Sequence, residues 1–252
     1  MARHREHLSK APLREALIDI QFEPRVSLEA VDRFVTTLGE ATRNVTDLWE
    51  ASFGIEGDGD GRPPKTRMGQ TVVGRRLELK HGPYVLQCRP AGFTLSRLSP
   101  YGEWIELRAE AQKLWIEFCR HIERVTVNRI AVRYINELRL PFPLVNFGVF
   151  LTCPPEVPGE LPQGITGFLT RVMIPDEANN SMAVVTQALE GPPSESPTGA
   201  SVTVLLDIDV FRHGAIEPLL GDALWHGLDV LRLQKNRMFF AHVTEKTLEM
   251  YE

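Results

Sequence analysis

Two kinds of hydrophobic periodicity alternate along the chain. Residues 17–22, with the sequence LIDIQF, alternate apolar and polar side chains, which is typical of a strand with one buried face. From Ser27 the apolar positions recur every three or four residues, which predicts a helix to about Arg43 with Ser27 as its N-cap. The fold is therefore expected to begin with a strand and an amphipathic helix.

The same patterns predict the other elements. Further strands are expected at 45–54, 67–80, 83–90, 92–98, 124–140, 144–153, 165–174, 181–190 and 204–211. A second helix should begin with Ser99 as N-cap and end near His121, a third should end at a C-cap on Asn236, and a short last helix should begin at Thr244. Because the first strands are joined by short connections, they should be antiparallel neighbours. We therefore predict an α+β fold with a large, mainly antiparallel sheet and amphipathic helices packed on one face.

Two segments of the chain resemble each other. Compared without gaps, residues 17–29 and 205–217 are identical at four of thirteen positions, and each is a predicted strand that leads into an amphipathic helix. An internal duplication would explain the similarity, and so would chance, since strands use few residue types. We predict a basic first half at 1–142 and an acidic second half at 143–252, packed together as one unit.

Composition indicates an ordinary globular protein. The chain has 252 residues, of which 43% are apolar and 24% charged, and its N-terminus, MARHREHLSK, lacks the apolar core of a signal peptide. No window approaches the ~20 apolar residues of a membrane span. The three cysteines are far apart and lack the paired spacing of a zinc or redox site. A cytoplasmic protein without a membrane anchor and without a cofactor is expected.

Positive charge is concentrated in the first half. Residues 1–140 carry a net charge of plus three and residues 141–252 carry minus eight. Between residues 61 and 100, eight basic residues face a single acid, Glu78. Paired strands would bring a basic set onto one exposed sheet face, namely Arg76, Lys80, Arg89, Arg129 and Arg133. Such a face attracts phosphates or an acidic partner protein, although an ordinary solvated face balanced by the acidic second half has the same residues.

One short motif suggests catalysis. Glu78 and Lys80 project from the same side of a predicted strand, as in the E-x-K pair of metal-dependent nucleases, where the carboxylate binds Mg²⁺ and the ammonium stabilises the charge at the scissile phosphate. The second carboxylate would have to come from Asp58 or Asp60, in the acidic turn EGDGDG. The E-x-K pattern alone is common by chance. No P-loop, nucleophile elbow, dinucleotide fingerprint or zinc-protease motif accompanies it.

Three polar residues interrupt apolar strand patterns. Asp207 and Asp209 lie about 7 Å apart on one side of a strand, given its ~3.3 Å rise per residue. They could bind a cation with His213, but a solvated or arginine-paired strand face requires no further ligand and is favoured. Asn136 falls on the apolar face between Tyr134 and Leu138, where a structural role in binding backbone is favoured over ligand contact.

Four segments carry a family resemblance: APLREALIDIQF near the start, RYINELRLP in the middle, and LLDIDVF and LRLQKNRMFFAHVTEK toward the end. Together they resemble a sporadically distributed prokaryotic family of uncharacterised proteins of similar length. The resemblance implies a patchily inherited protein, as genes of mobile or defence islands often are. It implies no catalytic residue.

These observations favour binding over catalysis. We expect a non-catalytic protein that engages nucleic acid or an acidic partner protein through the basic sheet face, or that forms a homo-oligomer. The alternatives are a metal-dependent nuclease that uses Glu78 and Lys80, and a structural subunit whose strand edges and acidic second half contact another protein.

Overall fold

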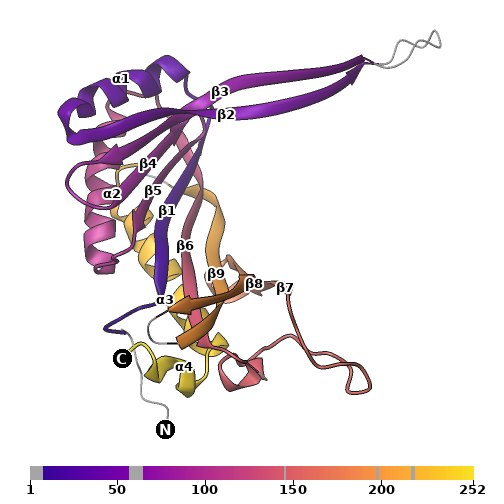
Figure 1. Cartoon of the computed structure of the whole chain (residues 1–252). Helices are drawn as coiled ribbons and strands as arrows, with labels where there is room; N and C mark the ends of the chain where they lie inside the picture. The colour runs from indigo at the N-terminus through magenta and orange to yellow at the C-terminus, as the bar shows by residue number, and fades with distance from the viewer. Residues whose placement is uncertain (1–7, 57–64, 145, 197–198, 217–218) are drawn as a thin grey trace.

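Figure 1 shows the computed structural model, which describes residues 8–56, 65–144, 146–196, 199–216 and 219–252. Within these residues the centre of the molecule is one nine-stranded antiparallel sheet, with the strand order β2-β3-β4-β5-β1-β6-β9-β8-β7. The strands are β1 (Leu13–Glu23), β2 (Thr42–Glu56), β3 (Lys65–Leu79), β4 (Tyr84–Arg89), β5 (Gly92–Leu98), β6 (Thr126–Pro141), β7 (Leu169–Asp176), β8 (Ser181–Ser196) and β9 (Gly199–Ile216). The helices are α1 (Leu28–Leu38), α2 (Trp104–Cys119), α3 (Asp222–His242) and α4 (Glu245–Glu249). The predicted α+β fold with a large antiparallel sheet is confirmed.

Helix boundaries follow side-chain capping more closely than the apolar pattern predicts. The Ser27 side chain accepts a hydrogen bond from the Ala30 amide and starts α1 as expected, but the helix ends at Leu38, because Gly39 adopts a positive φ of 40°. The second helix begins at Trp104 and not after Ser99, since Glu103 and Glu106 form a capping box there.

The third helix is longer than its sequence predicts. The C-cap expected at Asn236 is wrong, because α3 continues to His242. Buried residues on both sides of Asn236, including Leu231 and Phe239, keep the helix packed against the sheet. Burial of an apolar stripe therefore outweighs the weak preference of asparagine for a helix end.

Two predicted segments differ in the second half. The strand expected at 144–153 is wrong: this region contains a 3-10 turn, Phe147–Val149, and a single bridge from Leu151 to Val243. Its apolar residues belong to the same core cluster as Leu248 of α4, and the Thr247 hydroxyl donates to the Phe150 carbonyl at 2.6 Å. The expected strands at 181–190 and 204–211 are both longer than predicted, because β8 and β9 also include most of the proline-rich segment 191–199 and pair as far as Ser196 and Gly199.

The helices cover one face of the sheet. Ile18 and Ile20 of β1, Val132 of β6 and Ile208 of β9 all point to this face and are fully or almost fully buried. Toward β4 and β5 the core is aromatic, with Phe93 and Phe118 packed against Trp115. α1 and α2 lie over the first strands and α3 lies over β6 and β9 (Figure 1). No helix in the described residues packs on the opposite face, which we call the open face.

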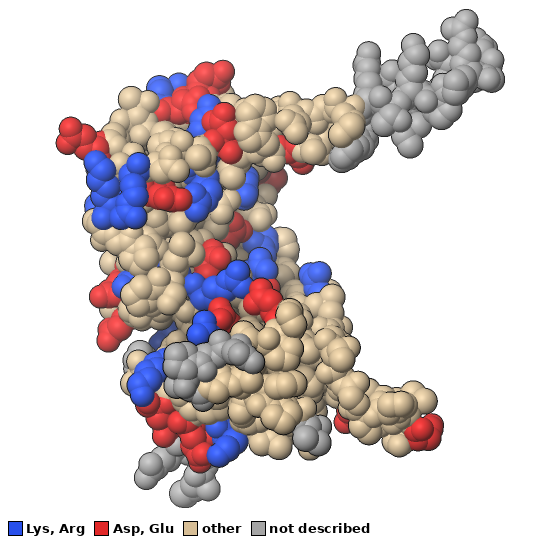
Figure 2. All heavy atoms as spheres, in the orientation of Figure 1, with Lys and Arg blue, Asp and Glu red and all other residues tan. Residues whose placement is uncertain are grey.

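The sheet is continuous across both predicted halves, because β6 of the first half pairs with β9 of the second along most of its length. The β2–β3 hairpin projects beyond the helices (Figure 1), and the outline of the molecule is concave between this hairpin and the β8–β7 end of the sheet (Figure 2). None of the described helices has the length and apolar character that a membrane crossing requires.

Gly74 of β3 provides a test of the strand arrangement. A Cβ at this position would lie 2.3 Å from the carbonyl oxygen of Cys88 in the neighbouring strand. Gly74→Ala should therefore lower the free energy of unfolding by roughly 1–3 kcal/mol, since the backbone must shift to relieve the overlap. The measurement is chemical denaturation. Gly167→Ala, which meets no atom within 4 Å, is the control, and equal stability of the two variants would contradict this arrangement of β3 and β4.

Candidate functional site

Arg129 of β6 connects three strands on the open face. Its guanidinium donates to Asp19 of β1 at 2.8 Å and to Asp209 of β9 at 3.3 Å. Arg129 and Asp19 are each only 15% exposed in their side chains. The Thr94 hydroxyl donates to the other oxygen of Asp19 at 2.7 Å and extends the network to β5. Asp19 is therefore held between two strands by hydrogen bonds.

Arg133, four residues further along β6 and on the same face, forms a second pair. Its Nε and Nη2 atoms donate to the two oxygens of Asp207 at 2.8 and 2.6 Å, which is the bidentate geometry that guanidinium and carboxylate groups favour. This hydrogen bonding raises the pKa of Arg133. The pKa of Asp209 is raised by burial, while Arg129 and Arg133 oppose the shift.

The arginine-paired interpretation of Asp207 and Asp209 therefore matches the structure. The His213 ring packs edge-on against Phe211. Over the described part of the chain, His, Cys, Asp and Glu side chains nowhere gather in threes as ligands of one metal ion would.

The remaining residues of the predicted basic set lie toward the β2 edge. Arg76 of β3 donates to Glu78 at 2.7 Å, and Arg89 of β4 donates to Gln87 at 2.7 Å. Lys80 is exposed just after β3 ends. Alternation places Arg76, Arg89, Arg129 and Arg133 on the open face, but β5 and β1 separate the first pair from the second.

The open face thus carries mixed charge and not a uniform basic patch. Arg76, Arg129 and Arg133 are each bound to a carboxylate of their own chain. In Figure 2, Lys and Arg atoms alternate with Asp and Glu atoms over the area of β1, β6 and β9. Beside these pairs, Leu169 and Met173 of β7 reach the same face and are 73% and 59% exposed.

Only part of the possible nuclease motif, Glu78 and Lys80, lies within the described residues. Glu78 accepts its hydrogen bond from Arg76, so its carboxylate already has a cationic partner. Asp58 and Asp60, which would supply the second carboxylate, lie outside the described residues. Catalysis by Glu78 and Lys80 therefore stays a prediction.

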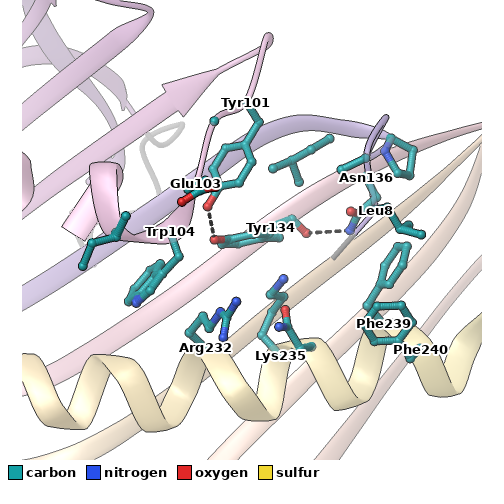
Figure 3. Close-up of a pocket in the computed structure, with 16 residues that line it drawn as sticks. Leu8, Tyr101, Glu103, Trp104, Tyr134, Asn136, Arg232, Lys235, Phe239 and Phe240 are labelled. Carbon is teal, nitrogen blue, oxygen red and sulfur yellow. Dashed lines mark hydrogen bonds between the residues drawn. The ribbon is translucent and has the colours of Figure 1, made fainter. Parts of the chain in front are cut away.

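A second site lies on the helix-covered side of β6, where sequence patterns predicted only core. A pocket of about 380 Å³ opens between α3, β6 and the segments that precede α2 and β1. Five of its sixteen lining residues are aromatic, and two basic residues of α3, Arg232 and Lys235, also line it (Figure 3). The lining includes Tyr101, Trp104, Tyr134, Asn136, Arg232 and Lys235.

Hydrogen bonds fix the pocket walls. The hydroxyls of Tyr101 and Tyr134 are 2.5 Å apart, and the Trp104 indole donates to Asp229 of α3 at 2.8 Å. Asn136 donates its amide to the carbonyls of Leu206 and Tyr134, so it binds strand backbone as a structural asparagine does. The preferred structural interpretation of Asn136 agrees with these contacts, although the same residue also lines the pocket.

Lys235 is the most unusual group of the pocket. It is 7% exposed, and its ammonium nitrogen lies 3.5 Å from the centre of the Tyr134 ring. Burial, and secondarily the charge of Arg232, lower the pKa of Lys235 well below its usual value. Burial also raises the pKa values of Tyr101 and Tyr134, which keeps both phenols protonated at neutral pH.

The segments of the family resemblance occupy the centre of this architecture. APLREALIDIQF contains most of β1, RYINELRLP lies in β6, and LLDIDVF lies in β9, while LRLQKNRMFFAHVTEK carries both basic residues of the pocket. The chain matches no model of a known protein family, and no curated protein matches it significantly. Membership of the uncharacterised prokaryotic family stays a prediction.

Arg129 is expected to be essential for stability. Arg129→Met would leave Asp19 and Asp209 without their shared partner and should cost roughly 3 kcal/mol of unfolding free energy. Arg139→Met on the same strand is the matched control, because Arg139 is 73% exposed and should change stability by less than about 0.5 kcal/mol. Chemical denaturation measures both, and similar losses would contradict the central role of Arg129.

Asp209 should give a measurable pH dependence. Its pKa in the folded protein lies above the ordinary value of 3.8, so the folded state binds the proton more tightly than the unfolded state. The wild-type protein should gain stability relative to Asp209→Asn as the pH falls from neutral toward about 4. Denaturation across this range measures the difference, and the opposite slope would mean that the arginines outweigh burial.

Proposed function

We propose that this chain is a non-catalytic binding protein whose open face contacts a partner protein. The observation that carries the proposal is the combination, on one helix-free sheet face, of mutually paired charges and exposed apolar side chains. The paired charges lie on β1, β6 and β9, and the apolar groups are Leu169 and Met173 of β7. Protein interfaces combine apolar and paired polar groups in this way.

A phosphate polymer is a less suitable partner for this face. Nucleic-acid affinity depends on cations that replace the counterions of phosphates, and Arg129 and Arg133 would first have to leave Asp19, Asp209 and Asp207. A protein partner can bind while these pairs remain intact. A different protein is favoured over a second copy, because a net charge of −5 opposes self-association.

The chemistry of the face favours binding over catalysis. Its central acids accept hydrogen bonds from arginine, and its central arginines are donors to those acids. None of these groups is therefore free to act as a general base or a nucleophile.

The test begins with the tagged chain isolated from its native host at endogenous expression and low salt. A protein that co-purifies should then be titrated, in pure form, against the wild-type chain and against Leu169→Ser/Met173→Ser. Removal of these apolar contacts should weaken binding about tenfold or more. Leu233→Ser is the control, because Leu233 is similarly exposed but belongs to α3 on the other side of the sheet.

Three outcomes would contradict the proposal. The chain could emerge alone, the two variants could bind the partner equally, or nucleic acid could co-purify. In the last case, salt-dependent binding that Arg76→Glu/Arg89→Glu abolishes would assign the face to phosphate recognition.

A further inference from the structure

We propose that the pocket between α3 and β6 binds a small organic anion. Arg232 and Lys235 hold the negative group, and the aromatic walls, which include Trp104 and Tyr134, surround the apolar part (Figure 3). This site lies on the opposite side of the sheet from the open face and is independent of the partner proposed for that face.

The cations of the pocket lack a counter-ion among the described residues. Arg232 and Lys235 are three positions apart on α3, so they are neighbours on the same helix face. Neither makes an ion pair with a described carboxylate, whereas the nearby Arg108 is paired with Asp229 at 3.1 Å. The acid on the pocket lining is Glu103, which is exposed and caps α2. The charge of Arg232 and the amine of Lys235, which a bound anion would help to protonate, are therefore available to a ligand.

The phenol pair adds a further donor. Tyr101 and Tyr134 each have one O–H group, and their mutual hydrogen bond uses only one of the two. Since both phenols stay protonated, the second O–H can be donated to a ligand oxygen. Together with Arg232 and Lys235, this gives three donor groups around one cavity. Because hydrogen-bond donors outnumber free acceptors there, the cavity favours a ligand group that is negatively charged and rich in acceptor atoms.

Lys235 would be an unfavourable choice for a purely structural position. A buried charge is costly unless it is paired, and the Tyr134 ring supplies only a cation–π contact, which is worth about 0.5–2 kcal/mol. An apolar side chain would fill the same space without this cost. A bound anion provides the missing counter-charge for both Lys235 and Arg232.

The size and walls of the pocket define the ligand class. A volume of about 380 Å³ is within the roughly 300–1,000 Å³ of small-molecule sites and exceeds what an inorganic anion fills. Phe239 and Phe240 extend the aromatic lining toward the N-terminal segment. Because Tyr101 and Trp104 are already hydrogen-bonded to Tyr134 and Asp229, the walls are ordered before a ligand arrives. These features fit a carboxylate or phosphate monoester with an aromatic or aliphatic body.

Binding is expected to be coupled to proton uptake. The titratable groups that line the pocket together with Lys235 are Arg232 of α3, Tyr134 of β6 and, before α2, Tyr101 and Glu103. In the empty pocket, burial and Arg232 lower the pKa of Lys235, and a bound anion raises it again. The complex therefore binds more protons than its components, and affinity should fall as the pH rises.

The experiment uses naphthalene-2-carboxylate as the probe and its neutral amide, naphthalene-2-carboxamide, as the matched control ligand. Isothermal titration calorimetry with the full chain should give a dissociation constant below about 1 mM for the acid, a value typical of a ligand of this size. The amide should bind about tenfold or more weakly, because it lacks the charge-assisted hydrogen bonds. Titrations in two buffers of different ionisation enthalpy should show proton uptake.

Variants assign the binding to the pocket. Lys235→Met and Arg232→Met should each weaken binding of the acid about tenfold or more, while Arg237→Met, an exposed change on the same helix, should leave it unchanged. Circular dichroism and thermal melting check that the variants are folded. If Lys235→Met fails to fold, Arg232→Met decides, because Arg232 is only partly buried.

Other outcomes overturn the proposal. Equal binding of the acid and the amide would show an apolar pocket without anion selectivity. Unchanged binding in a folded Arg232→Met or Lys235→Met variant would place the probe elsewhere. If neither naphthalene-2-carboxylate nor phenyl phosphate, the second probe, binds, the pocket is not a site for organic anions.

Discussion

The two-sided character of β6 is the constraint on which the rest of the structure depends. Successive side chains of a strand point to opposite faces, so Val132 and Tyr134 face the helices while Arg133, between them, faces Asp207. β6 also has a neighbour on each side, β1 and β9, and Arg129 is bound to an acid from each. The same strand therefore provides the floor of the helix-side pocket and the charged centre of the open face.

Electrostatics and packing specify the same register for β6. A shift by one residue would turn Arg129 and Arg133 toward the core and Val132 toward solvent, which burial and charge both oppose. The paired arginines need not add much net stability, because desolvation offsets much of their attraction. Their contribution is to make alternative pairings of β1, β6 and β9 costly, since each alternative leaves carboxylates such as Asp19 half-buried without a partner.

Local patterns predicted most of the fold, whereas pairing between distant segments decided the candidate sites. Alternation located β1, β6 and β9, and short connections predicted the antiparallel order from β2 to β5. Residues 144–153 were mispredicted because their apolar side chains pack in the core beside α4 and do not form a strand ladder.

The charge of the open face could not be judged from composition, since Arg133 and Asp207 are 74 residues apart. The sequence could not indicate the position of Lys235, because a lysine within an apolar helix is ordinarily expected to extend to solvent, whereas this one is buried against Tyr134. Asn136, on the apolar face of its strand, was the one local sign of a polar feature on that side.

The two sides of β6 differ in how their charges are satisfied, and this difference separates the two kinds of binding. On the open face the arginines and aspartates are partners already, so a protein can cover them without breaking or replacing a charge pair. In the pocket, Arg232 and Lys235 repel each other, and no described carboxylate pairs with either. In the empty protein, burial and this repulsion disfavour the protonated form of Lys235, and a bound anion favours it again. Selectivity follows from the same effect, because an anion stabilises the protonated form of Lys235 beside Arg232 and a neutral ligand of equal shape does not.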